Sequence, residues 1–240
     1  MNLWYVLYVK ELKDNRGTFL FLLAATLVLD SYAYTRGMVD GQPTPYLALA
    51  LVPFVTVFVF PFVLLHSFAQ EFKGQTHYQL LALPVPRAAV VAAKFLAVLT
   101  AGVALFVLAM GAVHLVSLDY TILTRGRFSA YRASDLWLFA GQFYFTSLLL
   151  LMGIATAMAG LKLLIKRFQG LAMTAFLVAS LYLYGQVLRV AVLGPIFIIM
   201  GDMGRAGHLS SLFPVTFFSV LFSLLFVGLG ILLFERFAEA

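Results

Sequence analysis

The sequence predicts an all-α integral membrane protein, and three observations point to this class. Of its 240 residues, 63% are hydrophobic and only 11% are Asp, Glu, Lys or Arg, whereas an average soluble domain carries roughly 25% charged residues. Several apolar runs reach the length of about 20 residues that a helix needs to cross the hydrocarbon core. These runs are continuously apolar and do not alternate with period two, which favours helices over barrel strands.

Six such runs follow one another, and we expect them to form a single transmembrane domain over residues 1–240. The third run is longer than one crossing requires, so we expect it to tilt or to end earlier. An even number of spans puts both termini on the same side of the membrane. The expected spans lie near residues 18–34, 46–68, 88–118, 136–161, 168–188 and 213–234.

The basic residues orient these spans, because cytoplasmic loops carry an excess of Lys and Arg. With the N-terminus inside, ten of the 16 basic residues fall on the inner side, and every lysine is among them. We therefore expect both termini in the cytoplasm and the chain in the cell (inner or cytoplasmic) membrane. The outer loop at residues 119–135 carries three arginines against this bias.

Two segments outside the spans also have membrane character. Residues 1–17 predict a short amphipathic helix in the interface, since Tyr5, Tyr8 and Leu12 share one side of a helix and the charged residues lie on others. The alternative is a simple flanking anchor.

Residues 190–212 are too apolar for an ordinary loop and are broken by glycines and Pro195, which predicts a re-entrant outer segment. A longer fifth span kinked at Pro195 is the alternative.

Several chemistries are missing from the sequence. There is no G-x-x-x-x-G-K-[ST] motif, so ATP-driven action would need a partner, and no H-E-x-x-H or G-x-S-x-G motif. The absence of cysteine excludes disulfides and thiolate metal sites. The net charge of +6 is typical of topology signals and headgroup contacts here, so we expect no nucleic-acid binding. Metal and cofactors are expected to be absent from this chain.

The four histidines leave haem as a weak alternative. His66 and His77 fall near the inner face, and His114 and His208 near the outer one. Neither pair is spaced by one helical turn, as two ligands from one helix would be.

Polar residues inside the spans mark a candidate translocation path. The spans are nearly free of charge, and a proton-coupled carrier would show more intramembrane charge. An ion-gradient-driven secondary transporter or channel therefore stays an alternative. The candidate lining residues are Gln142, Thr146, Tyr182, Tyr184 and Gln186.

The polar segment at residues 71–84 follows the second span. Its leucines favour about two helical turns over residues 75–83, which Pro84 would end. Arg87 and Lys94 then open the third span, where we expect their long side chains to snorkel to the interface. Taken alone, the segment is compatible with any cytoplasmic loop.

This region resembles the ABC-2 family of ATP-binding-cassette transporter permeases. In that family an acidic residue, a glycine-threonine region, a leucine-rich turn, Leu-Pro-Val and a basic residue precede a lysine in the third span. The chain departs from the pattern in having Gln75 between Gly74 and Thr76, and in its arginine-rich outer loop. The matching residues are Glu71, Gly74, Thr76, Leu80, Leu81, Leu83, Pro84, Val85, Arg87 and Lys94, and Lys10, Glu11, Leu12 and Arg16 are similar to the family's start.

The resemblance implies a non-enzymatic permease subunit of an ATP-driven transporter that exports or flops an amphipathic substrate. Separate ABC ATPase subunits would bind ATP and Mg and dock on residues 71–84. Residues 1–17 would be the connecting helix, and a second or paralogous permease would pair with this one, with the second and fifth spans lining the path. A membrane enzyme or haem subunit is the remaining alternative. The implied ATPase-binding residues are Glu71, Lys73, Gly74, Tyr78, Leu80, Leu81 and Pro84.

Overall fold

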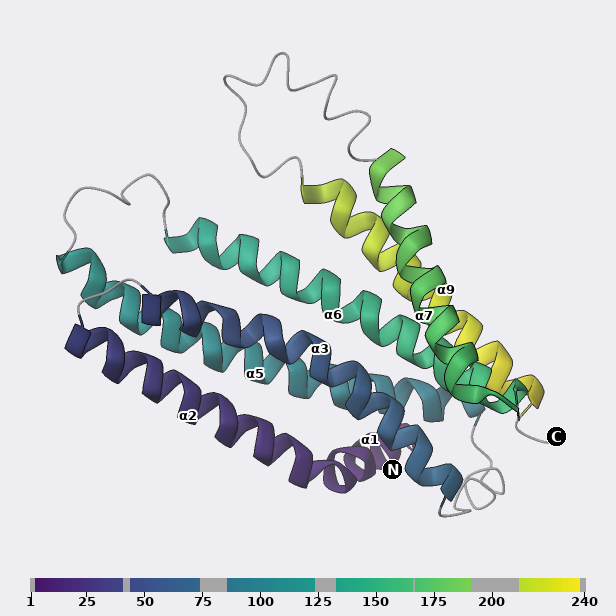
Figure 1. The fold of residues 1–240 in the computed structure, drawn as a ribbon. Coiled ribbons are helices and arrows are strands. Elements are labelled where there is room, and N and C mark those ends of the chain that lie inside the picture. Colours follow the sequence, from purple (N-terminus) through teal and green to yellow (C-terminus); the bar gives the residue numbers. More distant parts are fainter. Residues whose placement is uncertain are drawn as a thin grey trace. The chain divides into compact units, whose positions relative to one another are not determined.

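The structure, a computed structural model, describes residues 3–40, 44–73, 86–123, 133–165, 167–190 and 212–237. These residues are almost entirely helical and contain no strand, so the all-α prediction is confirmed for them. The helices are α1 (Leu3–Asp14), α2 (Arg16–Asp40), α3 (Thr44–Lys73), α5 (Arg87–Leu123), α6 (Ala133–Leu164), α7 (Gln169–Leu188) and α9 (Leu212–Phe237) (Figure 1).

Each of the six predicted spans coincides with one helix, from α2 to α9. α5 has 37 residues, which at about 1.5 Å per residue is about 55 Å, well beyond the hydrocarbon core of about 30 Å. The predicted re-entrant segment lies almost wholly outside the described residues. Among those that are described, four stretches are long and apolar enough to cross a membrane: Ala88–Gly111, Gly141–Lys162, Gln169–Leu188 and Val215–Arg236.

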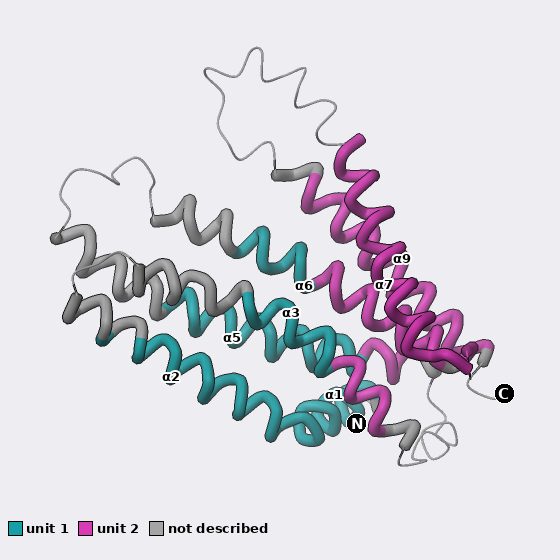
Figure 2. The backbone as a smooth tube through the Cα atoms, viewed as in Figure 1, with its two compact units in different colours: residues 1–63, 93–148 teal, residues 64–92, 149–240 magenta. Residues whose placement is uncertain are grey.

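The helices are distributed over two compact units (Figure 2). The first unit comprises residues 1–63 and 93–148, and the second comprises residues 64–92 and 149–240. Helices α3, α5 and α6 contribute residues to both units. Each unit is therefore assembled from helical segments that are distant in the sequence.

The core of the first unit is centred on Tyr144 of α6, which is fully buried. Its hydroxyl donates a hydrogen bond of 3.0 Å to the backbone carbonyl of Gly102 in α5 and shares one of 3.3 Å with the hydroxyl of Thr56 in α3. Its ring stacks on Phe106 of α5, with the centroids 4.5 Å apart. Because a buried hydroxyl is costly without a partner, these bonds join three helices at one point.

We expect Tyr144→Phe to lower the free energy of unfolding by about 0.5–1.5 kcal/mol, because the hydroxyl's hydrogen bonds are lost while the ring stacking is kept. Unfolding of the purified protein in mixed detergent micelles would measure the change. Tyr182→Phe is the matched control, since Tyr182 is 67% exposed and should give no change. Equal stabilities of the two variants would contradict the role assigned to Tyr144.

The second unit contains a close contact between α6 and α9. A Cβ atom added to Gly230 would lie 2.7 Å from the carbonyl oxygen of Thr156, and one added to Gly153 would lie 2.9 Å from the Cα of Ser223. The Ser223 hydroxyl donates a hydrogen bond of 2.7 Å to the carbonyl of Leu149. Small residues let membrane helices approach closely enough for such backbone contacts, so this glycine seam (Gly153, Thr156, Ser223 and Gly230) sets the separation of α6 and α9.

Helix α7 is mostly exposed by comparison. Of its apolar stretch only 6% is buried, against 72% of the stretch in α6. Ser180 is its one buried residue, and side chains such as Phe176 reach Phe226 of α9, with the ring centroids 5.9 Å apart. The remaining surface of α7 is left for lipid or for another chain.

Candidate functional site

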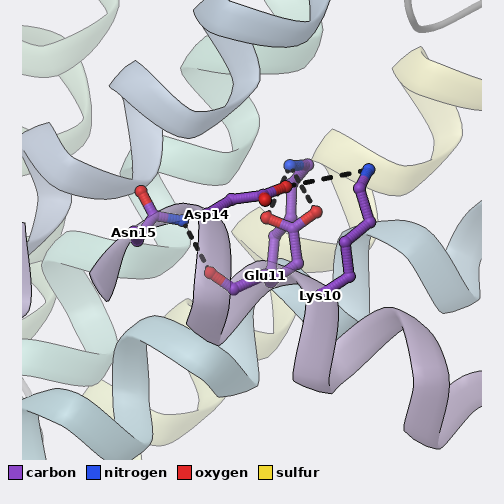
Figure 3. Close-up of polar contacts among 5 residues, drawn as sticks. Lys10, Glu11, Asp14 and Asn15 are labelled. Atoms are coloured by element: carbon purple, nitrogen blue, oxygen red, sulfur yellow. Dashed lines mark hydrogen bonds and ion pairs between the residues drawn. The ribbon is translucent and has the colours of Figure 1, made fainter. Parts of the chain in front are cut away.

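The N-terminal helix α1 packs on protein through one narrow side. Leu7, Glu11 and Asn15 follow at intervals of four residues and are buried, as residues on one side of a helix are. The side-chain amide of Asn15 donates a hydrogen bond of 3.0 Å to the carbonyl of Glu11 (Figure 3). The predicted N-terminal helix is confirmed, but Tyr5 of its predicted apolar side is 57% exposed. The buried side therefore includes a charge that hydropathy would assign to water.

That charge is paired across the first unit. Lys94 Nζ donates hydrogen bonds to both carboxylate oxygens of Glu11, each 2.8 Å long, and the two side chains are only 1% and 4% exposed. The prediction that Lys94 snorkels to the interface is wrong, because Glu11 brings the opposite charge to it inside the protein. A second contact joins the same helices, since the Tyr8 hydroxyl donates to Thr100 Oγ1 at 3.1 Å.

The buried pair holds α1 in one position on α5. Charge-assisted bidentate hydrogen bonds are among the strongest in proteins, and removing one partner of a buried pair costs about 3–5 kcal/mol. By contrast, the pair between Lys10 and Asp14 on the same helix is half-exposed and 4.0 Å long (Figure 3). Exposed pairs of that kind contribute only a few tenths of a kcal/mol, far less than the cost of breaking the buried pair of Glu11 and Lys94.

One of the paired helices, α5, follows the predicted ATPase-binding segment in the chain. Glu71 and Lys73 are in the last turn of α3, while Gly74, Tyr78, Leu80, Leu81 and Pro84 lie outside the described residues. Helix α5 begins at Arg87, three positions after the end of this segment, and Lys94 is seven residues further on. The helix that α1 contacts through the buried pair is thus the one that the segment leads into.

The predicted path residues divide between the two units. Thr146 is buried in the first unit, and its hydroxyl donates to the carbonyl of Gln142 in its own helix at 2.8 Å. In the second unit the hydroxyls of Tyr184 and Ser219 share a hydrogen bond, whereas Tyr182 is exposed. This difference is expected because Tyr182 and Tyr184 are two residues apart in α7, so their side chains point about 200° apart around the helix axis. Gln142 and Gln186 are half-buried. The structure does not test the path itself, which stays a prediction.

One polar residue was missed by the path prediction. Asp30 of α2 is only 6% exposed, and neither of its carboxylate oxygens has a hydrogen-bond partner among the described residues. An acidic side chain in a membrane span is costly to bury. Its isolation within an apolar run was the only signal available in the sequence.

The helices that can cross a membrane and the N-terminal helix held by a buried charge pair define a multi-pass membrane protein of the all-α class. A comparison with protein families makes the class specific, because the model of the ABC-2 family transporter protein matches residues 12–158. The chain therefore belongs to the ABC-2 transporter family, and the resemblance of residues 71–94 to this family is confirmed. A search of curated proteins found no match.

The family match runs from the last turn of α1 to the last third of α6, and it includes Lys94 and the whole of residues 71–84. Helices α7 and α9 lie beyond it. ABC-2 permeases are generally the membrane subunits of transporters, without an ATPase motif of their own, and normally work with ABC ATPase subunits. This chain is accordingly a permease component.

Proposed function

We propose that the chain is the permease subunit of an ATP-driven transporter that exports or flops an amphipathic substrate. It crosses the inner membrane six times with both termini in the cytoplasm, and a separate ATPase subunit binds Mg and hydrolyses ATP. Family membership supports the permease class. The buried pair of Glu11 and Lys94 is the observation that supports coupling through α1 and α5.

In this proposal residues 71–84 are the surface on which the ATPase subunit acts. Closure of the ATPase on ATP can bias the membrane helices only through a surface that contacts the moving subunit. A displacement of this segment would move the start of α5 at Arg87, because the two are joined through the backbone. The first turns of α5 then carry α1 with them, because Lys94 is bound to Glu11 through two hydrogen bonds.

A second copy of the permease would pack on α7. The exposed side of this helix bears an open groove of about 600 Å³, lined by residues that include Ala175, Ala179 and Tyr182. Small side chains allow a close approach of membrane helices, and α7 is barely covered within one chain. The proposed substrate path would use Gln142, Thr146, Tyr182, Tyr184 and Gln186, and residues 190–212 would form the re-entrant outer segment.

Substituting the leucines of residues 71–84 tests the ATPase contact. We expect Leu80→Asp with Leu81→Asp to reduce co-purification of the ATPase subunit at least about tenfold, because two carboxylates would be desolvated in an apolar contact. Pull-down through a tag on the permease, followed by quantification of the ATPase subunit and of ATP hydrolysis, measures the effect. Arg236→Ala is the charge control, since it also lowers the net charge at an exposed position, and it should leave the complex intact.

Two results would contradict this proposal. The first is that the wild-type permease purifies without any ATPase subunit. The second is that the variants at Leu80 and Leu81 still form the complex. Solute movement by the purified chain in liposomes without ATP would instead indicate a carrier driven by an ion gradient.

A further inference from the structure

A small cavity in the second unit has a largely apolar wall that also includes Lys162 and His66. Its volume is about 250 Å³, and it lies among α3, α6 and α7. Most of the wall is apolar, and none of the described residues that line it is acidic. The residues that matter here are Leu65, His66, Phe68, Ala69, Lys162 and Met173.

Among the described residues, the only full charge at the cavity is the ammonium of Lys162, in the last turn of α6. Its side chain is half-buried, and within the described part of the chain it has no hydrogen bond or ion pair. Lys94, in contrast, is neutralised by Glu11. Because partial burial weakens the hydration of an ammonium, a cation left in this state favours an anionic ligand.

His66 offers a second donor at the same cavity. The amide nitrogen of Gln70 lies 2.8 Å from His66 Nε2, and an amide nitrogen can only donate. The Nε2 atom therefore accepts, which leaves the ring proton on Nδ1 as a donor. The cavity is thus lined by a cation and by an imidazole that can donate a hydrogen bond, a set suited to phosphate oxygens.

Basic and aromatic residues lie in the turn between α6 and α7, the two helices that supply Lys162 and Met173 to the cavity. Phe168 has a positive φ of 58° and is 71% exposed, and the guanidinium of Arg167 lies 5.3 Å from the centre of its ring. The sequence places Lys166 immediately before them. Exposed aromatic and basic residues at the end of a membrane span are typical of the headgroup layer.

We propose that this cavity binds the headgroup of an anionic phospholipid from the bilayer. The phosphate forms an ion pair with Lys162 and accepts from His66, while the first part of an acyl chain covers the apolar wall at Leu65, Phe68 and Met173. A free phosphate ion would satisfy the cation but would leave this wall in contact with water. The lipid is favoured by the position at the end of a membrane span and by a charge that no described residue compensates.

Lipid binding to the full-length protein in detergent micelles tests the proposal. The probes are phosphatidylglycerol and phosphatidylcholine, and bound lipid is counted by native mass spectrometry. We expect Lys162→Ala to weaken phosphatidylglycerol binding about fivefold, the effect of one basic contact, while phosphatidylcholine binding stays unchanged. Lys162→Arg should retain binding. Ala69→Leu should abolish it by filling the cavity without altering any charge, and melting temperatures will show which variants are folded.

Control measurements distinguish a specific lipid site from diffuse charge attraction, an ion site and a protein contact. Arg236→Ala removes an exposed cation elsewhere and should change binding by less than about twofold. An equal loss in Lys162→Ala and Arg236→Ala would mean diffuse attraction and would overturn the proposal. Displacement of the lipid by millimolar inorganic phosphate would show an ion site instead. Loss of the ATPase subunit in Lys162→Ala, with lipid binding intact, would assign the cavity to a protein partner.

Discussion

Lys94→Ala should lower the free energy of unfolding by about 3–5 kcal/mol, because it removes the ammonium that binds both oxygens of the buried Glu11 carboxylate. Glu11→Ala should have a similar effect, since it takes the carboxylate of Glu11 away from the buried ammonium of Lys94. Both side chains are at least 96% buried, so water cannot replace the lost partner. Unfolding of the purified protein in mixed detergent micelles measures both changes.

Two further variants show whether buried charge causes the loss. Lys10→Ala breaks the exposed pair with Asp14 and should change stability by no more than about 0.5 kcal/mol. Glu11→Leu combined with Lys94→Met removes both charges and should recover most of the stability, because apolar side chains often replace a buried pair without loss. If Lys94→Ala were no more destabilising than Lys10→Ala, the pair could not hold α1 on α5.

The double variant also separates stability from coupling, on the assumption that the proposed function holds. Apolar contact is less directional than two hydrogen bonds to one carboxylate, so α1 should follow α5 less faithfully. We expect the double variant to fold and to hydrolyse ATP with its partner, but with fewer substrate molecules moved per ATP. Unchanged transport per ATP would show that Glu11 and Lys94 act only in folding.

Gly230→Ala should destabilise the second unit by about 1–3 kcal/mol, the usual cost of overpacking. The new methyl would lie 2.7 Å from the carbonyl oxygen of Thr156 and 2.9 Å from its Cγ2, so α6 and α9 must move apart. Alanine is intrinsically the better helix former by about 1 kcal/mol, which offsets only part of this cost. A larger loss is expected for Gly230→Leu, and the same unfolding assay measures both.

The matched control lies two residues away on the same helix. A Cβ atom at Gly228 would meet nothing within 4 Å, so Gly228→Ala should be neutral or stabilising by up to about 1 kcal/mol. The comparison cancels the intrinsic difference between glycine and alanine in α9. Equal effects at Gly228 and Gly230 would contradict the close approach of α6 and α9.

Much of the fold could be predicted because membrane helices are specified locally. A helix lies over each of the six predicted spans and over the predicted N-terminal helix, and four of the described stretches are long and apolar enough to cross a membrane, since about 20 apolar residues in succession favour a helix in a bilayer. The assignment to the ABC-2 family rested on residues 71–94 and on the similarity of residues 10–16 to the family's start, and the match to residues 12–158 confirmed it. Both kinds of signal are contained in short stretches of sequence.

The paired charges and the helix contacts were not predictable in this way. Lys94 was expected at the interface because the charge of a lysine is normally kept in water, and nothing near it in sequence marks its partner. Glu11 is 83 residues away. The close contact between α6 and α9 could not be predicted from their glycines either. Gly228 and Gly230 look alike in the sequence, and only Gly230 lies against the backbone of another helix.

Hydropathy and missing motifs were therefore sufficient to establish an all-α membrane chain without its own P-loop, because these properties depend on each residue's affinity for lipid or on a contiguous motif. Only tertiary structure decided the partner of Lys94, the contact at Gly230 and the position of Lys162, whose charge has no partner among the described residues. They depend on which surfaces meet after the helices have packed, and that choice is made by distant residues acting together.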